Sequence, residues 1–386
     1  MRIVMIAPFG IRPKGTLLAR MLPLAQALHR RGHAVTIVAP PVHNPTDGGT
    51  HRSYDGVIVI HTATPPLSGL PAALWHTIAL WQQTRRLRPD VIHLFKPKGF
   101  GGLAVLARGR VPLVVDCDDW EGPGGWNDLL PYPRPAKLLF AWQERDLPRR
   151  ADAVTVVSHT LETLVWAMGV PPQRVFYLPN GAVPNEPLPP RPTERPTIVL
   201  YTRFWELDVA EVATVLATIH HARPTARLLL IGKGERGEEQ RLLAQAAAEG
   251  WLTMVDYRGW QEPTAIPSLL AEADVALAPI SDTLINRARG MAKLVELLAA
   301  GLPIVASDVG TARDYLAPDA GILVPPGNPN ALAAAVINLL DDATARTKLR
   351  TAALAAAHRL RWDNLALIAE TAYRQTGLSI KSNAMV

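Results

Sequence analysis

The sequence predicts an α/β protein made of two doubly wound domains, and three observations support this prediction. The chain has 386 residues, 48% of them hydrophobic, which is enough for two cores of ordinary domain size. Short apolar runs without polar alternation are separated by longer amphipathic segments, as in a parallel sheet covered by helices on both faces. Six of the 13 residues from Pro184 to Pro196 are proline, so an extended linker divides the chain near its middle.

The first half reads as buried strands separated by helices. Residues 3–7 predict the opening strand, and residues 17–31, closed by Gly32, predict the first helix. The remaining strands of this half are expected at residues 34–39, 57–60, 91–95, 111–115, 153–157 and 175–178.

The second half repeats this arrangement after the linker. Its strands are expected at residues 197–201, 227–231, 253–257, 275–279, 303–307 and 321–324, with helices at about 328–358 and 361–376. Ligands of doubly wound sheets bind outside the carboxyl ends of the strands. We therefore expect functional residues just after strands, around a cleft between the two domains.

The excess of positive over negative charge lies in the first half of the chain. The chain has a formal net charge of +6, but residues 1–190 hold 20 Lys and Arg against 13 Asp and Glu, a net charge of +7. No basic run, basic stripe or nucleic-acid-binding module accompanies this excess, so we expect no nucleic acid as a partner. The charge instead favours an anionic acceptor, such as a lipid phosphate, or an anionic membrane surface.

The single cysteine and the absence of a long apolar run indicate the compartment. Cys117 has no possible intrachain disulfide partner, and no apolar run reaches the roughly 18 residues of a membrane span. We expect a soluble, cytoplasmic protein, with peripheral contact to a membrane as one option.

Two segments of the second half carry charges that suit a phosphorylated ligand. The helix at residues 291–300 is apolar nearly all round, and its only charges, Lys293 and Glu296, share one face. A lysine there can meet a phosphate, and a carboxylate can accept hydrogen bonds from ribose hydroxyls. Arg203 follows the first strand after the linker, and its planar guanidinium suits a diphosphate.

Residues 232–237 form a literal G-x-G-x-x-G after a strand, and Asp256 follows about 20 residues later. This pattern allows a dinucleotide-binding turn or a plain strand–helix turn near a ligand. The second interpretation is favoured because the fingerprint belongs on the first strand of a sheet, whereas this strand is the second after the linker.

The first half contains an acidic, glycine-rich loop at residues 116–126, directly after a strand. Its acidic groups could bind a metal, act as a base or orient a sugar hydroxyl, and Trp120 and Trp126 could stack on an acceptor sugar. The alternative is that Asp119 caps a turn and Trp120 fills a gap. No cluster of His or Cys ligands accompanies the carboxylates, so we expect no metal and no cofactor.

Two glycine-bearing loops follow other strands of the first half. The loop from Gly10 to Gly15 precedes a helix whose free amides could receive a phosphate. Lys96 and Lys98, in the loop after residues 91–95, would add positive charge to the cleft.

These residues together resemble the group 1 family of retaining glycosyltransferases, which have the GT-B fold. The match covers most of the chain and is strongest at residues 293–310 and 321–327, with middle landmarks at residues 151–158 and 179–181. Trp362 and Asp363 resemble the family's closing helix, which crosses back to the first domain. The resemblance thus implies a first domain of residues 1–183 plus 362–386, a linker of residues 184–196 and a second domain of residues 197–361.

The resemblance implies a nucleotide-sugar donor on the second domain and a glycan or lipid acceptor on the first. The enzyme would be a glycosyltransferase of the hexosyltransferase type. By this likeness Arg203 and Lys293 contact the diphosphate, Glu296 the ribose and Gly15 a phosphate or the sugar. Arg258 and Gly259 would lie near the nucleobase, and Asp118 stands where many members place a histidine. Catalytic roles are expected for Asp118, Arg203 and Lys293.

Two positions depart from the family pattern. In the family's E-x7-E motif, the first glutamate is replaced by Ala288, and the usual lysine five residues after Arg203 is Asp208. Two alternatives to a retaining transferase stay open, and the departures suggest the second of them. One is a sugar-nucleotide epimerase of the same fold, and the other is a nucleotide-binding protein without catalysis.

Overall fold

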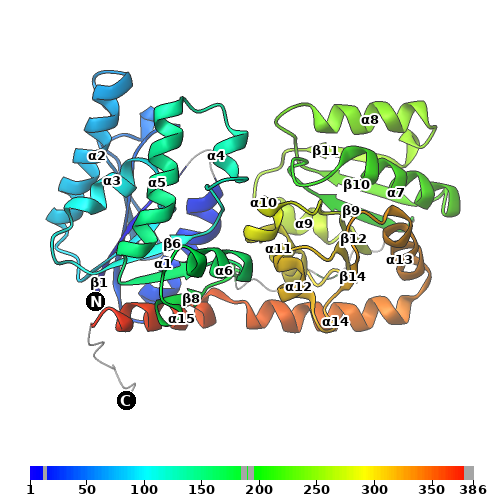
Figure 1. Ribbon diagram of the computed structural model, residues 1–386. Coiled ribbons are helices and arrows are strands. Elements are labelled where there is room, and N and C mark those ends of the chain that lie inside the picture. Colours follow the sequence, from blue (N-terminus) through cyan, green and yellow to red (C-terminus); the bar gives the residue numbers. More distant parts are fainter. Residues whose placement is uncertain (12–14, 184–188, 190–194, 378–386) are drawn as a thin grey trace, which may run out of the picture. The chain divides into compact units, whose positions relative to one another are not determined.

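The computed structural model describes residues 1–11, 15–183, 189 and 195–377. The chain forms two structural units (Figure 1). The first contains residues 1–181, the short segment 288–290 and the chain from Trp362 onward, and the second contains residues 182–287 and 291–361. The proline-rich linker predicted at residues 184–196 falls almost entirely outside the described residues.

The first unit is built on an eight-stranded sheet. Its strands are arranged in the order β3-β4-β2-β1-β5-β6-β7-β8, and every neighbouring pair is parallel except β3 with β4. The strands are β1 (Arg2–Ile6), β2 (Ala34–Ala39), β3 (His51–Tyr54), β4 (Val57–His61), β5 (Val91–Phe95), β6 (Leu113–Cys117), β7 (Ala153–Val156) and β8 (Val175–Tyr177). β1, β5, β6 and β7 are almost fully buried, as expected for a sheet covered on both faces.

Helices connect these strands and cover the sheet (Figure 1). They are the π-helical turn η1 (Leu17–Met21), α1 (Leu22–Arg30), η2 (Pro45–Asp47), α2 (Gly69–Arg86), α3 (Gly99–Ala104), η3 (Val105–Ala107), α4 (Trp126–Leu129), α5 (Arg134–Arg150), α6 (His159–Ala167), η4 (Pro172–Arg174) and α15 (Trp362–Gln375). The last of these, red in Figure 1, buries Trp362, Ala366 and Tyr373 in the same cluster as Ile3 and Met5 of β1.

The second unit contains a six-stranded, wholly parallel sheet in the order β11-β10-β9-β12-β13-β14. Its strands are β9 (Thr197–Tyr201), β10 (Arg227–Ile231), β11 (Val255–Gly259), β12 (Val275–Ala278), β13 (Ile304–Ser307) and β14 (Ile322–Val324). Its helices are α7 (Val209–Ala222), α8 (Glu238–Ala248), η5 (Leu252–Met254), α9 (Ile266–Leu270), α10 (Leu284–Ala288), α11 (Ala292–Ala299), α12 (Thr311–Leu316), α13 (Pro329–Asp341) and α14 (Ala343–Arg359).

The clearest differences between the predicted and the observed elements are at four places. The antiparallel edge strand β3 was not expected, and β6 and β11 each begin two residues later than predicted. The long helix expected at residues 328–358 is two helices, because the Asp342 side chain accepts the amide of Ala345 and starts a new helix there. The later start of β6 places Asp116 inside the strand and not in the loop after it.

Among the described residues, no helix combines the length and the apolarity that crossing a bilayer requires.

Candidate functional site

In the second unit, three side chains meet at the carboxyl end of the central strand β9. Lys293 and Glu296 lie on α11, and Tyr201 is the last residue of β9. The Lys293 ammonium nitrogen lies 3.7 Å from the centre of the Tyr201 ring, and the Tyr201 hydroxyl donates a hydrogen bond to the Glu296 carboxylate. Lys293 and Glu296 therefore both contact an aromatic side chain, that of Tyr201, which the sequence pattern did not indicate. The position of Tyr201 at the end of a predicted strand is the signal that could have found it.

The surroundings of this cluster raise the pKa of both Glu296 and Tyr201. Burial raises the pKa of Glu296, while the charge of Lys293 and the Tyr201 hydroxyl lower it by less. Part of the Glu296 residue is nevertheless exposed to solvent, so a ligand can reach its carboxylate. Burial and the neighbouring Glu296 raise the pKa of Tyr201, so its hydroxyl stays protonated and donates at neutral pH.

Arg203 lies two residues beyond the end of β9 and presents an exposed guanidinium group. Its side chain is 54% exposed, lies over Trp205 and has one weak ion pair, 3.4 Å from Glu235. Its backbone amide donates to the buried Glu206 carboxylate at 3.2 Å, which holds the turn after β9. The guanidinium can therefore exchange Glu235 for the oxygens of an anionic ligand with little loss.

Asp208, which replaces the family's usual lysine, caps a helix. Its carboxylate accepts the amides of Ala210 and Glu211 at 2.8 and 3.2 Å, at the start of α7. Ala288, which replaces the first glutamate of the E-x7-E motif, is fully buried and supplies neither charge nor a side-chain hydrogen bond.

The G-x-G-x-x-G segment forms a strand–helix turn whose amides are already occupied. Gly234 donates to the Glu239 carboxylate at 2.9 Å, and Arg236 donates to Glu238 at 2.8 Å. These carboxylates stand where a dinucleotide's pyrophosphate would bind, so the structure favours the plain turn over the dinucleotide fingerprint.

The same turn lies against the two residues expected near the nucleobase. Gly232 has a φ of +126°, and a Cβ atom there would lie 1.8 Å from the Thr202 carbonyl oxygen. Its amide donates to the carbonyl of Gly259 at 2.7 Å. Arg258 is paired with Asp256 at 2.8 Å, so much of its charge is offset. The ends of β9, β10 and β11 thus bring Arg203, Gly232 and Gly259 to one edge.

In the first unit, Asp116 is a structural residue and not part of the acidic loop. Its fully buried carboxylate receives Nε and Nη2 of the buried Arg20 at 2.9 and 2.7 Å, and the Thr155 hydroxyl at 2.6 Å. The acidic loop that faces outward from β6 therefore begins with Asp118.

Two lysines from the loop after β5 pair with this acidic loop. The Lys96 ammonium lies 3.4 Å from Oδ1 of Asp118 and also contacts Asp119. Lys98 lies 2.5 Å from Oε2 of Glu121. The structure therefore brings the two predicted lysines and the predicted Asp118 together, but as neighbours whose charges offset each other.

The two buried members of this cluster titrate far from their ordinary ranges. Burial, together with Asp119 and Asp116, raises the pKa of Asp118, while Lys96 and Arg20 lower it by less, so that it stands at about 7. Burial by itself would lower the pKa of Lys96, but the surrounding carboxylates outweigh it and raise that pKa. Lys96 thus remains charged, while Asp118 can gain or lose a proton near neutral pH.

The two loop tryptophans differ in their surroundings. Trp120 is 7% exposed, and its indole nitrogen donates to the Pro123 carbonyl at 2.8 Å. A Cβ atom at Gly122 would lie 2.2 Å from the Trp120 ring, so this ring fills the loop interior and offers no free face for stacking. Trp126, the first residue of α4, is half-buried.

Two further predictions for this chain concern Gly15 and the metal site. Gly15 is exposed at the start of the helical segment before α1, and residues 12–14 of its loop lie outside the described residues. Within the described part of the chain, no three His, Cys, Asp or Glu side chains are grouped so that they could hold a metal ion.

Comparison with known families matches both halves of the chain. Residues 15–181 match the model described as a glycosyl transferase 4-like domain, and residues 195–342 match the model of the glycosyl transferases group 1. The chain therefore belongs to the group 1 glycosyltransferase family. It is a glycosyltransferase with the GT-B fold, acting on a nucleotide sugar, as the resemblance predicted.

Individual relatives agree with this assignment. The chain is 28% identical to a GDP-mannose-dependent alpha-mannosyltransferase of Mycobacterium tuberculosis, over 80% of this chain and 79% of the relative. It is 27% identical to a phosphatidyl-myo-inositol mannosyltransferase of Mycobacterium leprae, over 95% and 94%. Its fold is similar to that of sucrose-phosphate synthase from Thermosynechococcus elongatus, with a TM-score of 0.75 and 20% identity, covering 97% and 98% of the two chains.

The raised pKa of Asp118 predicts a pH-dependent difference in stability. A carboxyl group with a folded pKa of about 7 binds a proton between pH 4 and 7 that the unfolded chain has released, so its contribution to stability falls as the pH rises through this window. Asp118→Asn cannot titrate. The free energy of unfolding of the variant minus that of the wild type should therefore increase with pH, by at most about 1.4 kcal/mol per pH unit, up to pH 7. Above pH 7 this difference should stay constant. Urea unfolding across this range measures the difference, and parallel profiles would contradict the raised pKa.

Proposed function

We propose that the chain transfers a sugar from a nucleotide-diphosphate sugar to a glycan or lipid acceptor with retention of the anomeric configuration. The observation that carries this proposal is the cluster of Lys293, Tyr201 and Glu296, with Arg203 beyond the same strand. It combines two cations and a solvent-reachable carboxylate at the carboxyl edge of a parallel sheet, where such sheets bind their ligands. Because relatives are named as mannosyltransferases, GDP-mannose is the first donor to test.

In this proposal, the second unit binds the donor and stabilises the leaving group. Lys293 and Arg203 meet the diphosphate and stabilise the negative charge that develops as its bond to the sugar breaks. Glu296 accepts hydrogen bonds from the ribose hydroxyls, and the backbone of Arg258 and Gly259 lies near the base. The protein supplies these cations itself, so we propose that the reaction needs no metal ion or other cofactor.

The first unit would supply the groups around the reacting sugar and the acceptor. Asp118, with a pKa of about 7, can orient a hydroxyl or hold a proton there. Lys96 keeps that carboxylate in place, and Gly15 is proposed to approach a phosphate or the sugar. Lys98 and Trp126 remain candidates for acceptor contact. Asp118→Ala should lower turnover more than donor affinity, which comparison of kcat with the donor dissociation constant would show.

A donor panel followed by product analysis tests the reaction. Stabilisation against thermal unfolding is measured with GDP-mannose and with UDP-, ADP- and dTDP-sugars, because a ligand that binds only the folded state raises the melting temperature. The stabilising donor is then incubated with candidate acceptors, and NMR of the product gives its anomeric configuration. An inverted product would contradict retention. Donor binding without transfer or hydrolysis would contradict catalysis, and interconversion of the free donor would indicate an epimerase.

Substitutions in the Lys293 cluster test the donor site. Lys293→Ala removes a charge-assisted contact to the diphosphate and should weaken donor binding roughly 10- to 100-fold. Glu296→Gln, which keeps the shape but loses the charge, should have a smaller effect in the same direction. Calorimetric titration measures both. The matched control is Lys348→Ala on the exposed face of α14, and wild-type affinity in all three variants would contradict the assignment.

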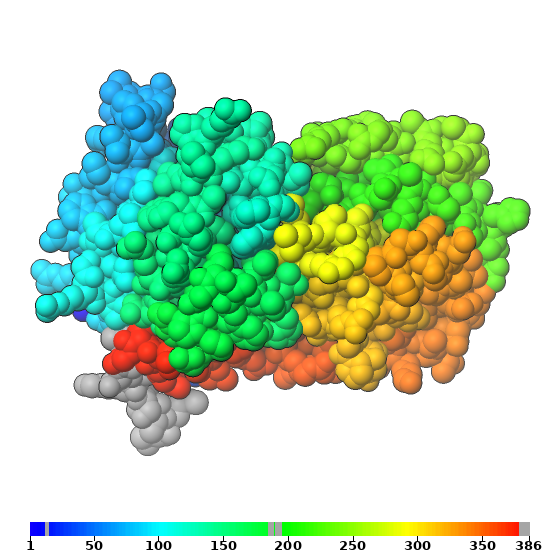
Figure 2. All heavy atoms as spheres, viewed as in Figure 1, coloured from blue at the N-terminus to red at the C-terminus, as the bar shows by residue number. Residues whose placement is uncertain are grey.

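We also propose that the first unit contacts an anionic membrane or lipid acceptor through α2. This helix has no acidic residue, ends in Arg85 and Arg86, and exposes Leu70, Leu74 and Ile78 at four-residue intervals. The segment, blue to cyan in Figure 2, projects at the surface of its unit. Such a stripe can enter the lipid interface while the arginines meet phosphates.

Co-sedimentation with anionic vesicles should fall as salt rises, and Leu74→Ser with Ile78→Ser should reduce it. Salt-independent binding would contradict the proposal.

A further inference from the structure

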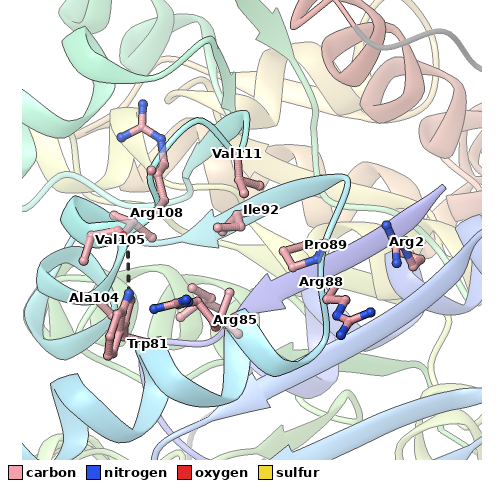
Figure 3. A pocket seen from close by; sticks show the side chains of 14 residues that line it. Arg2, Trp81, Arg85, Arg88, Pro89, Ile92, Ala104, Val105, Arg108 and Val111 are labelled. Atoms are coloured by element: carbon pink, nitrogen blue, oxygen red, sulfur yellow. Dashed lines mark hydrogen bonds between the residues drawn. The ribbon is translucent and has the colours of Figure 1, made fainter.

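A pocket lies in the first unit, away from the acidic loop. This pocket, of about 570 Å³, lies between the sheet, α2 and the α3–η3 segment, and reaches the edge where β1, β5 and β6 begin (Figure 3). Asp118 and Lys96 lie at the other end of these strands. We call it the arginine pocket, after the four arginines in its lining: Arg2, Arg85, Arg88 and Arg108.

The charge of the arginine pocket is strongly one-sided. None of its lining residues is acidic. Arg2 is paired with the neighbouring Asp90 at 2.8 Å, whereas Arg85 lies over the Trp81 ring at 5.1 Å and Arg108 donates to the Arg150 carbonyl at 3.1 Å. Within the described part of the chain, no carboxylate pairs with the guanidinium groups of Arg85, Arg88 or Arg108. Three positive charges therefore surround one pocket without a protein counter-charge.

Two buried polar atoms of the lining add to this imbalance. Thr84 is 5% exposed, and its hydroxyl oxygen has no hydrogen-bond partner. The buried Nε of Arg108 also lacks an acceptor. Buried polar groups are costly unless they are paired. Both of these atoms can donate, so a ligand rich in acceptor oxygens would satisfy them.

The rest of the lining indicates more than a bare ion. Trp81, Ile92, Val105 and Val111 provide apolar walls, as Figure 3 shows for the labelled side chains. The volume lies in the range of small-molecule sites and exceeds what an inorganic anion would fill. Planar guanidinium groups are suited to phosphate oxygens, and the apolar walls suit the organic part of the molecule.

We propose that the arginine pocket is an ancillary binding site for a phosphate-bearing organic anion, separate from the strand edge that carries Asp118. In Figure 3 the three guanidinium groups point in different directions, so the phosphate would meet Arg85 and the Thr84 hydroxyl, while Arg88 and Arg108 add positive charge around it. Such a ligand can be a soluble phosphate ester or the headgroup of an anionic lipid, and the experiment distinguishes these two sources. The proposal does not depend on the transfer reaction, because its readout is binding alone.

Two charge-matched double variants test the proposal. Arg85→Gln with Arg88→Gln removes two lining charges, whereas Arg134→Gln with Arg149→Gln removes two exposed charges from the same unit that lie neither in the pocket lining nor on α2. Calorimetry measures binding of glucose 6-phosphate and of inorganic phosphate. Co-sedimentation uses vesicles of phosphatidylcholine alone and of equal parts phosphatidylcholine and phosphatidic acid.

The lining variant should bind its ligand about tenfold or more weakly than the wild type, while the control variant stays close to the wild type. Loss of glucose 6-phosphate binding identifies a soluble ester, and this binding should survive Leu74→Ser with Ile78→Ser. Loss of vesicle binding alone identifies a lipid headgroup when Leu74→Ser with Ile78→Ser, which disrupts the proposed α2 contact, retains that binding. The proposal is overturned if no probe binds, if both double variants lose binding equally, or if inorganic phosphate binds as tightly as the ester.

Discussion

The buried ion pair between Arg20 and Asp116 is the constraint on which the first unit's strand edge depends. Both side chains are almost fully buried, and Arg20 also donates to the carbonyl oxygens of Leu178 and Pro179 and to Asn180. Removing either partner would leave an uncompensated charge in the core, which typically costs about 3–5 kcal/mol. The pair therefore ties η1, β6 and the segment after β8 together. The loop that carries Asp118 starts from this fixed point.

Two carboxylates two residues apart illustrate how surroundings separate structural from chemical roles. Burial raises the pKa of Asp116, but the adjacent Arg20 outweighs it, so that carboxylate stays ionised. The Asp118 side chain is 9% exposed and shares Lys96 with Asp119, and its pKa rises to about 7. One carboxylate thus holds the fold together, while the other is able to exchange a proton at physiological pH.

The sequence predicted what depends on local pattern and missed what depends on distant partners. Buried parallel strands were recognisable from their apolar runs, whereas β3 is polar and exposed and exists only through its hairpin with β4. Asp116 resembled a loop carboxylate because its partner, Arg20, lies 96 residues away. Lys293 and Glu296 were found from helical spacing, but the aromatic ring against which Lys293 packs, that of Tyr201, comes from strand β9.

The excess positive charge of the first half does not lie at Lys96 and Lys98, where the sequence motifs had indicated it. Lys96 and Lys98 face Asp118, Asp119 and Glu121, so the edge proposed to hold the reacting sugar carries little excess positive charge. Three arginines to which no carboxylate is paired in the described part of the chain, Arg85, Arg88 and Arg108, line the pocket beside α2 instead. Long-range attraction of an anionic partner would therefore act through the α2 side of this unit. In the proposed function, the acidic loop would bind neutral hydroxyl groups, for which paired carboxylates and lysines are well suited.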